Sequence, residues 1–160
     1  GALAGWSNMG GSAKDLYEEG VKLSFEQWGA GSATAYLADN TSTEKNYVDP
    51  ISEYGGDVSA VSNITIKWDD SATDEQKMER LITQKWIAMF PNGQEGWSEI
   101  RRTGYPKVFP LAQSTDYSIQ VANRIPFDID EATNNKANYI KAVQMLKGND
   151  DYATKMWWQR

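Results

Sequence analysis

The strongest constraint on the fold is the spacing of apolar side chains between residues 74 and 90. The large apolar residues recur at steps of three and four, which places them on one face of an α-helix. They are Met78, Leu81, Ile82, Trp86 and Met89. Thr73 or Asp74 can cap the start of this helix, and Pro91 ends it because proline disfavours a helical residue before it.

A second helix is expected over residues 94–103, directly after a Pro-Asn-Gly turn. Gly104 suits the left-handed residue that often follows a helix, and Pro106 lies just beyond. Trp97 and Ile100 are three residues apart and would share the inner face. Because the connection is short, we expect the two helices to be antiparallel neighbours.

Helical patterns also occur at residues 12–28 and 33–38. Ser12 can cap the first of these helices, with Asp15 three residues later. Gly20 weakens the helix but would permit close approach of another helix. The larger apolar positions of this helix are Leu16, Leu23, Phe25 and Trp28.

A last helix is expected over residues 136–147, capped by Asn134 or Asn135. Its expected inward side chains are Tyr139, Ile140, Val143 and Leu146. Residues 39–72 are rich in turn formers, and residues 105–133 read as irregular. The alternation at residues 64–68 is too short to identify a strand. The fold class is therefore mainly α, with helix hairpins and long irregular loops.

Composition excludes several functions. The 160 residues suffice for one domain and contain no histidine and no cysteine. Ser-His and Cys-His nucleophiles, and His or Cys zinc ligation, are therefore absent. The net charge of −6 argues against a nucleic-acid partner. We expect no cofactor and no metal, and no apolar run is long enough to span a membrane.

Four stretches together resemble the SusD/RagB family. The stretch "ITQKWIAMFPNGQEGWSEIRRTGYP" is similar to the family's Q-K-W-I-A-L-F helix, followed by G-x-E-A-W and R-R-T-G-Y-P. Three further segments match the family in the right order. "LYEEGVKLSFEQWG" lies upstream of this stretch, and "RIPFDIDEATNN" and "ATKMWWQ" lie downstream. The family-motif positions are Gln84, Lys85, Trp86, Trp97, Arg101, Arg102, Gly104, Tyr105, Pro106, Arg124 and Pro126.

The resemblance implies a glycan- or peptide-binding lipoprotein on the outer-membrane surface of Gram-negative bacteria. Such a protein is not an enzyme; it covers a TonB-dependent, SusC-like transporter and delivers ligand to it. The implied fold is a tetratricopeptide-like helical scaffold. The matched motifs belong to its C-terminal part, so residues 1–160 are expected to be that portion of a longer chain. Membrane association would then depend on an N-terminal lipid anchor outside these residues.

Most motif residues are better explained as scaffold than as a site. Trp86 and Trp97 are expected to face the interior of the helix hairpin. Arg101 and Arg102 could hold an anion, but cations at a helix C-terminus also offset the dipole. Catalysis is also not expected. Glu95 and Glu99 lie in one row along one helix, whereas glycoside hydrolysis needs two carboxyl groups that face each other across a sugar.

A calcium loop is an equally poor explanation of residues 128–131, "DIDE". This segment lacks the spaced ligands of an EF-hand, so a turn followed by a helix cap is expected.

Candidate ligand-binding residues lie in or near the polar segment 39–72. Sugar recognition needs aromatic faces, and Tyr47, Tyr54 and Trp68 are not obviously required by helices. Other candidates nearby are Tyr36, Asn46, Asp49 and Asp57. The alternative is that these aromatics only fix the loop onto the helices. A scaffold or transporter-docking role, with ligand bound elsewhere, also remains open, as does an isolated enzyme domain.

Overall fold

The structure is a computed structural model that describes residues 1–51, 56–109 and 121–159. Its elements in chain order are a short 3-10 helix, η1 (Ala2–Ala4), and the helices α1 (Ala13–Gln27), α2 (Thr34–Ala38), α3 (Asp74–Ala88), α4 (Gly93–Thr103), α5 (Ile129–Asn134) and α6 (Lys136–Leu146). Within these ranges the only β pairing is an isolated bridge between Tyr47 and Val58. The predicted mainly α class is confirmed.

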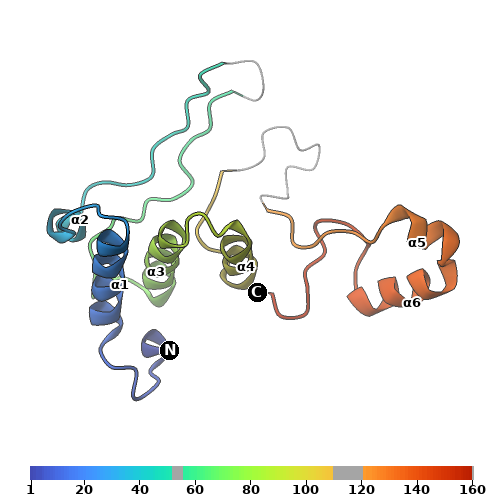
Figure 1. The fold of residues 1–160 in the computed structure, drawn as a ribbon, viewed down its shortest axis with the longest axis horizontal. Coiled ribbons are helices and arrows are strands. Elements are labelled where there is room, and N and C mark those ends of the chain that lie inside the picture. The colour runs from blue at the N-terminus through green and yellow to red at the C-terminus, as the bar shows by residue number, and fades with distance from the viewer. Residues whose placement is uncertain (52–55, 110–120, 160) are drawn as a thin grey trace.

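The helices form two groups along the molecule (Figure 1). In the first group, α1, α3 and α4 lie side by side, with α2 next to α1. In the second, α5 and α6 form a hairpin set apart from the others. The chain after α6 returns to α4, so the C-terminus lies near that helix.

Three predicted helix ends are confirmed. Ser12 and Asp15 form a reciprocal capping box at the start of α1. Thr73 and Gln76 form another at the start of α3. Gly104 follows α4 with a φ of 79°, a left-handed conformation that glycine adopts without steric cost.

The apolar core is small and lies between α1 and the segment before α3. Its main cluster consists of Tyr17, Val21, Ala33 and Trp68, and Ile82 of α3 is buried outside this cluster. The rings of Tyr17 and Trp68 are 5.3 Å apart, and the Tyr17 hydroxyl donates a hydrogen bond to the Ile66 carbonyl. Tyr17 and Val21, four residues apart, therefore form the buried face of α1.

The larger apolar positions of α1 do not form its buried face. Leu16, Leu23 and Trp28 are exposed, and only Phe25 packs against the core. The turn around Gly20 is also open, because nothing lies within 4 Å of a Cβ placed there. Within the described residues no other helix makes the close approach that Gly20 would permit.

The C-terminal hairpin differs from the prediction in two ways. Helix α5 lies in a region expected to be irregular, and Asp128 caps it through a hydrogen bond from the Asp130 amide. Helix α6 begins and ends as predicted, but it contains no buried residue, and Ile140 is exposed. Its main helix contact is with the short α5, and Tyr139 packs edge-on against Phe127 just before that helix.

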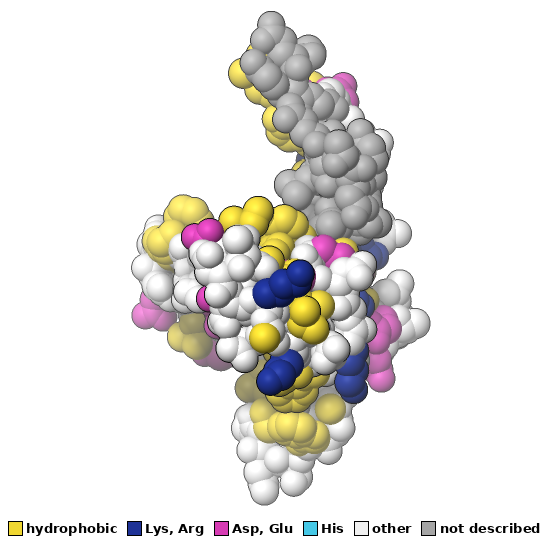
Figure 2. Space-filling model, turned by 90° about the vertical axis from the view of Figure 1, so that its right-hand side faces the viewer, with side chains coloured by type: hydrophobic (Ala, Val, Ile, Leu, Met, Phe, Trp, Pro, Cys, Tyr) yellow, Lys and Arg dark blue, Asp and Glu magenta, His cyan; other side chains and the backbone are white. Residues whose placement is uncertain are grey.

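Hydrophobic side chains remain open over much of the surface. Viewed from the α5–α6 side, they reach solvent in several separate places (Figure 2). No large side chain in the described ranges is completely buried. None of the helices described is long and apolar enough to cross a membrane.

The capping box of α3 yields a testable prediction. Replacing Thr73 with Ala removes the acceptor for the Gln76 amide and should lower the free energy of unfolding by about 1 kcal/mol. Urea titration followed by far-ultraviolet circular dichroism measures this change. Thr43→Ala, in an exposed loop, is the control and should change stability by less than about 0.5 kcal/mol. Equal effects of the two substitutions would contradict the capping role.

Candidate functional site

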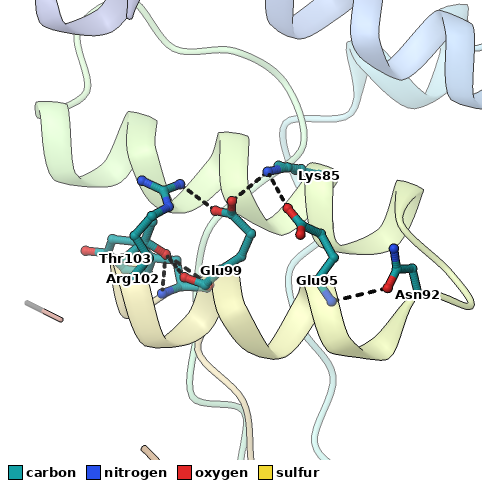
Figure 3. A network of polar contacts seen from close by, with 7 residues as sticks. Lys85, Asn92, Glu95, Glu99, Arg102 and Thr103 are labelled. Atoms are coloured by element: carbon teal, nitrogen blue, oxygen red, sulfur yellow. Dashed lines mark hydrogen bonds and ion pairs between the residues drawn. The ribbon is translucent and has the colours of Figure 1, made fainter. Parts of the chain in front are cut away.

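A network of charged side chains joins α3 to α4 (Figure 3). Glu99 of α4 accepts a hydrogen bond from Lys85 Nζ of α3 at 2.6 Å and another from Arg102 of its own helix at 2.5 Å. Lys85 also lies 3.5 Å from Glu95. Glu99 is buried, whereas Lys85, Glu95 and Arg102 reach solvent.

Two opposing effects act on the pKa of Glu99. Burial alone would raise it, because a charged carboxylate is less well solvated there. Hydrogen bonds from Lys85 and Arg102 outweigh burial, so the pKa lies below its ordinary value of 4.5. The carboxylate is thus charged at neutral pH and acts as the link between the two helices.

This geometry gives Glu95 and Glu99 a structural role. Both carboxylates belong to α4 and share Lys85 as a cation, instead of facing each other across a cleft. Glycoside hydrolysis requires two opposed carboxyl groups with room for a sugar between them. The pair does not provide that arrangement.

A second group of motif residues connects α4 to the C-terminal segment. The Arg101 guanidinium lies 3.9 Å from the ring centre of Trp97 and 4.6 Å from that of Trp158. Such contacts combine apolar packing with attraction between a cation and an aromatic face. The Trp97 indole N–H donates to the Ala122 carbonyl. Trp158 thus contacts α4, while its neighbour Trp157 is 92% exposed.

The remaining motif residues mostly make internal contacts. Arg124 is buried and paired with Asp150, which also accepts from the Phe127 amide and so closes the base of the α5–α6 hairpin. Tyr105 donates to Glu75, and Gln84 accepts from the Tyr36 hydroxyl. Pro126 is half-buried between Arg124 and α5, and Pro106 follows Tyr105.

Trp86 is less buried than expected. Its indole nitrogen lies 3.0 Å from the position that a Cβ at Gly96 would occupy, so the ring lies against α4 as predicted. The residue is nevertheless 44% exposed. It therefore contributes to the hairpin interface and to the open surface.

One candidate ligand site is a cavity of about 520 Å³ beside α3, which we call the α3 groove. Its walls come from α3, from residues 42–44 and 62–66, and from residues 106–109. The aromatic side chains that line it are Tyr36, Trp86 and Phe109; the polar ones include Ser42, Thr43, Glu44, Gln84 and Lys107.

Glu79 holds both walls of the α3 groove. This residue of α3 is only 4% exposed. Its carboxylate accepts from the Ser62 hydroxyl at 2.6 Å and lies 3.2 Å from Lys107 Nζ. Ser62 belongs to one wall and Lys107 to the other. The next residue, Arg80, donates to the Thr65 carbonyl and adds a second attachment.

The structure separates the predicted ligand-binding residues. Trp68 is 7% exposed in the core, with its indole N–H bonded to Asp70. Tyr47 is 46% exposed, and its ring centre lies 6.2 Å from that of Phe109. Tyr54 lies outside the described residues.

The polar residues predicted beside these aromatics bond within the loop. Asp57 accepts from the Asp49 amide, and Asn46 accepts from the Ala60 amide. The Glu44 carboxylate accepts hydrogen bonds from the amides of Val61 and Ser62. These bonds give the loop its shape next to the α3 groove.

Phe109 and Lys107 line the α3 groove but were not predicted from the sequence as ligand-binding residues. They directly follow the motif "RRTGYP", and that position is the only signal in the sequence that they might matter. Their place in the α3 groove depends on the chain turning back over α3 after α4. In the described part of the chain, no group of three acidic, His or Cys residues could hold a metal ion.

Comparison with known proteins points to one family. A sequence model described as SusD-like, SusD and RagB outer membrane lipoprotein, matches residues 1–159. A search of curated proteins finds no match.

Solved structures give the same result. A SusD-like protein from Bacteroides thetaiotaomicron is 48% identical with a TM-score of 0.86, and the match covers 99% of this chain and 34% of that one. A chitin-binding SusD homolog from Flavobacterium johnsoniae is 46% identical with a TM-score of 0.85, covering 99% of this chain and 33% of the other. A further SusD homolog from B. thetaiotaomicron is 42% identical, with a TM-score of 0.88 over 100% of this chain and 35% of its own. The chain thus spans about a third of the length of these relatives.

The Glu99 network predicts how stability depends on pH. Because the Glu99 pKa is lower in the folded than in the unfolded chain, its contribution is fully present above the ordinary value of 4.5. That contribution is lost as pH falls through the folded pKa. Glu99→Gln should therefore lower the free energy of unfolding by about 1 to 2 kcal/mol at pH 7 and weaken its decline below about pH 5. Urea titrations across this range measure both effects.

Glu95→Gln is the matched control on the same helix. Its carboxylate is half exposed and lies farther from Lys85, so the loss should be at most about 0.5 kcal/mol. If both variants unfold alike at every pH, Glu99 is not the link between α3 and α4.

Proposed function

This chain belongs to the SusD/RagB family, and we propose that it is part of a protein that captures glycans at the bacterial outer-membrane surface and delivers them to a TonB-dependent, SusC-like transporter. Residues 1–160 would form the C-terminal portion of that protein, anchored by a lipid at an N-terminus outside these residues. The proposed role is binding without catalysis.

Family membership is the observation that carries this proposal. The family is described as outer membrane lipoproteins, and one relative, 46% identical, is a chitin-binding SusD homolog. Nutrient capture at the cell surface agrees with that description. The four family motifs and the match to about a third of each relative support assigning this stretch to one portion of a longer chain.

The chemistry of the α3 groove supports a glycan as the ligand. Sugars present apolar ring faces and hydroxyl edges, so a site needs aromatic surfaces beside hydrogen-bonding groups. The groove combines Trp86 and Phe109 with the hydroxyls of Ser42 and Thr43. Its volume of about 520 Å³ lies within the usual range for small-molecule sites.

We assign the exposed Tyr47 and its neighbour Phe109 to the rim of this site. Trp68 would act indirectly, because its buried ring supports the segment that carries the groove wall. Tyr54 remains a candidate from the sequence alone.

A scaffold or transporter-docking role is the second candidate. It is favoured by the internal contacts of most motif residues, such as Arg101 between two tryptophans and Arg124 with Asp150. In that case the ligand, glycan or peptide, would bind mostly to parts of the protein outside this chain.

Calorimetric titration with chitooligosaccharides tests the glycan proposal. The wild-type chain should bind, and Phe109→Ala or Tyr47→Ala should weaken binding about 3- to 10-fold by removing an aromatic face. Trp157→Ala removes a more exposed aromatic side chain that does not line the groove and should bind like wild type. Circular dichroism establishes that each variant is folded.

The titration is extended to a panel of other oligosaccharides and short peptides. Saturable binding of peptides alone would replace glycan with peptide as the ligand. A folded wild-type chain that binds none of them would contradict a ligand site here and favour the scaffold role.

A further inference from the structure

One buried cation in the wall of the α3 groove keeps unused hydrogen-bond donors. Arg80, on α3, lines the groove and is only 5% exposed. Its Nε donates to the Thr65 carbonyl at 2.9 Å, but Nη2 lies 3.5 Å from the Thr65 hydroxyl, beyond the usual range for such bonds. Its Nη1 is buried and has no hydrogen-bond partner in the described part of the chain. The Nη1 and Nη2 groups therefore lack a strong acceptor.

Acidic side chains around the groove do not neutralise Arg80. None of the ion pairs in the part of the chain that the structure describes includes this guanidinium. Glu79, the preceding residue of α3, is paired with Lys107 instead. Glu44, in the groove wall, accepts hydrogen bonds from two backbone amides of the loop before α3.

Asp69 acts on Arg80 only from a distance. Hydrogen bonds from Ser71 lower the pKa of the Asp69 carboxyl, and the Arg80 charge adds to the effect. The Asp69 carboxylate is exposed and does not line the groove, and no ion pair among the described residues joins it to Arg80. The charge of Arg80 therefore has no direct partner at the groove wall.

A carboxylate on the ligand suits this unmatched charge. Burying a cation is unfavourable unless an acceptor pairs with it. The planar guanidinium of arginine binds a carboxylate through two parallel hydrogen bonds, and such charge-assisted bonds are stronger than neutral ones. An acidic group that enters the groove beside Arg80 would use the donors that Thr65 leaves free.

We propose that the α3 groove selects acidic glycans, with Arg80 recognising a carboxylate of the sugar. This deepens the proposed function and rests on it, because it takes the groove to be the glycan site. Trp86 and Phe109 line the same groove and supply faces for the sugar rings. Presenting Nη1 to the ligand requires a small turn of the guanidinium, whose Nη2 end is held only by the long contact with Thr65.

Paired ligands that differ only in charge test this proposal. They are oligogalacturonides of one length and the same oligomers as methyl esters, titrated calorimetrically into the wild-type chain. The acidic oligomer should bind about 10-fold more tightly, because a bidentate charge-assisted contact is stronger than a neutral one. Nonspecific attraction does not explain such a preference, since the chain has a net charge of −6.

Two substitutions of Arg80 identify the residue responsible. Arg80→Gln removes the charge, so both oligomers should bind with the affinity that wild type has for the methyl ester. Arg80→Lys keeps the charge but loses the planar fork, and the preference should fall to about 3-fold. Lys67→Gln removes one positive charge at an exposed position outside the groove and should keep the full preference. Circular dichroism establishes folding, and the wild-type comparison stands even where a variant does not fold.

Equal binding of the two oligomers by the wild-type chain would overturn the proposal, as would a folded Arg80→Gln chain that keeps the preference. Equal weakening of both oligomers by Arg80→Gln would also overturn it, since Arg80 would then act only by holding the segment that contains Thr65.

A separate readout distinguishes this proposal from the proposed function. Chitooligosaccharides that bind while neither galacturonide form does would overturn the acidic preference alone and leave glycan capture standing. A folded wild-type chain that binds none of these sugars would contradict the glycan site itself, and the acidic preference with it.

Discussion

A single buried carboxylate holds the centre of this structure. Glu79, on α3, bonds to Ser62 in the loop before the helix and pairs with Lys107 in the segment after α4. Two parts of the chain with no direct helix contact are thereby attached to one side chain. Because a buried charge without partners is strongly unfavourable, the arrangement of loop, helix and returning chain is coupled. The α3 groove lies between the Ser62 and Lys107 segments that Glu79 attaches to α3.

Paired charges take this role because the apolar core is so small. The four residues of its main cluster pack α1 against the segment before α3, and none of them belongs to α4. Glu99 links α4 to α3 through Lys85, and Arg124 with Asp150 closes the α5–α6 hairpin. Polar pairs specify geometry well but contribute less stability than apolar burial. The structure thus combines well-defined local contacts with extensive uncovered apolar surface.

Two kinds of open surface occur in the described part of the chain. The α3 groove mixes aromatic faces with hydroxyl and charged groups, as recognition of a polar ligand requires. Leu16, Trp28 and Phe90, by contrast, are large apolar side chains that are exposed outside this groove.

The sequence by itself determined all the longer helices and several of their ends, though not α5, since capping at Ser12 and Thr73 and termination at Gly104 depend on neighbours within a few residues. Its motifs also identified the family. Periodicity did not reveal which side of α1 is buried, because Leu16 and Trp28 are as apolar as Tyr17 and Val21. Only the tertiary structure decided that Trp68 belongs to the core and that Phe109 and Lys107 line a groove. Those positions depend on contacts between residues far apart in the chain, and the partners in such contacts are set by packing rather than by local preference.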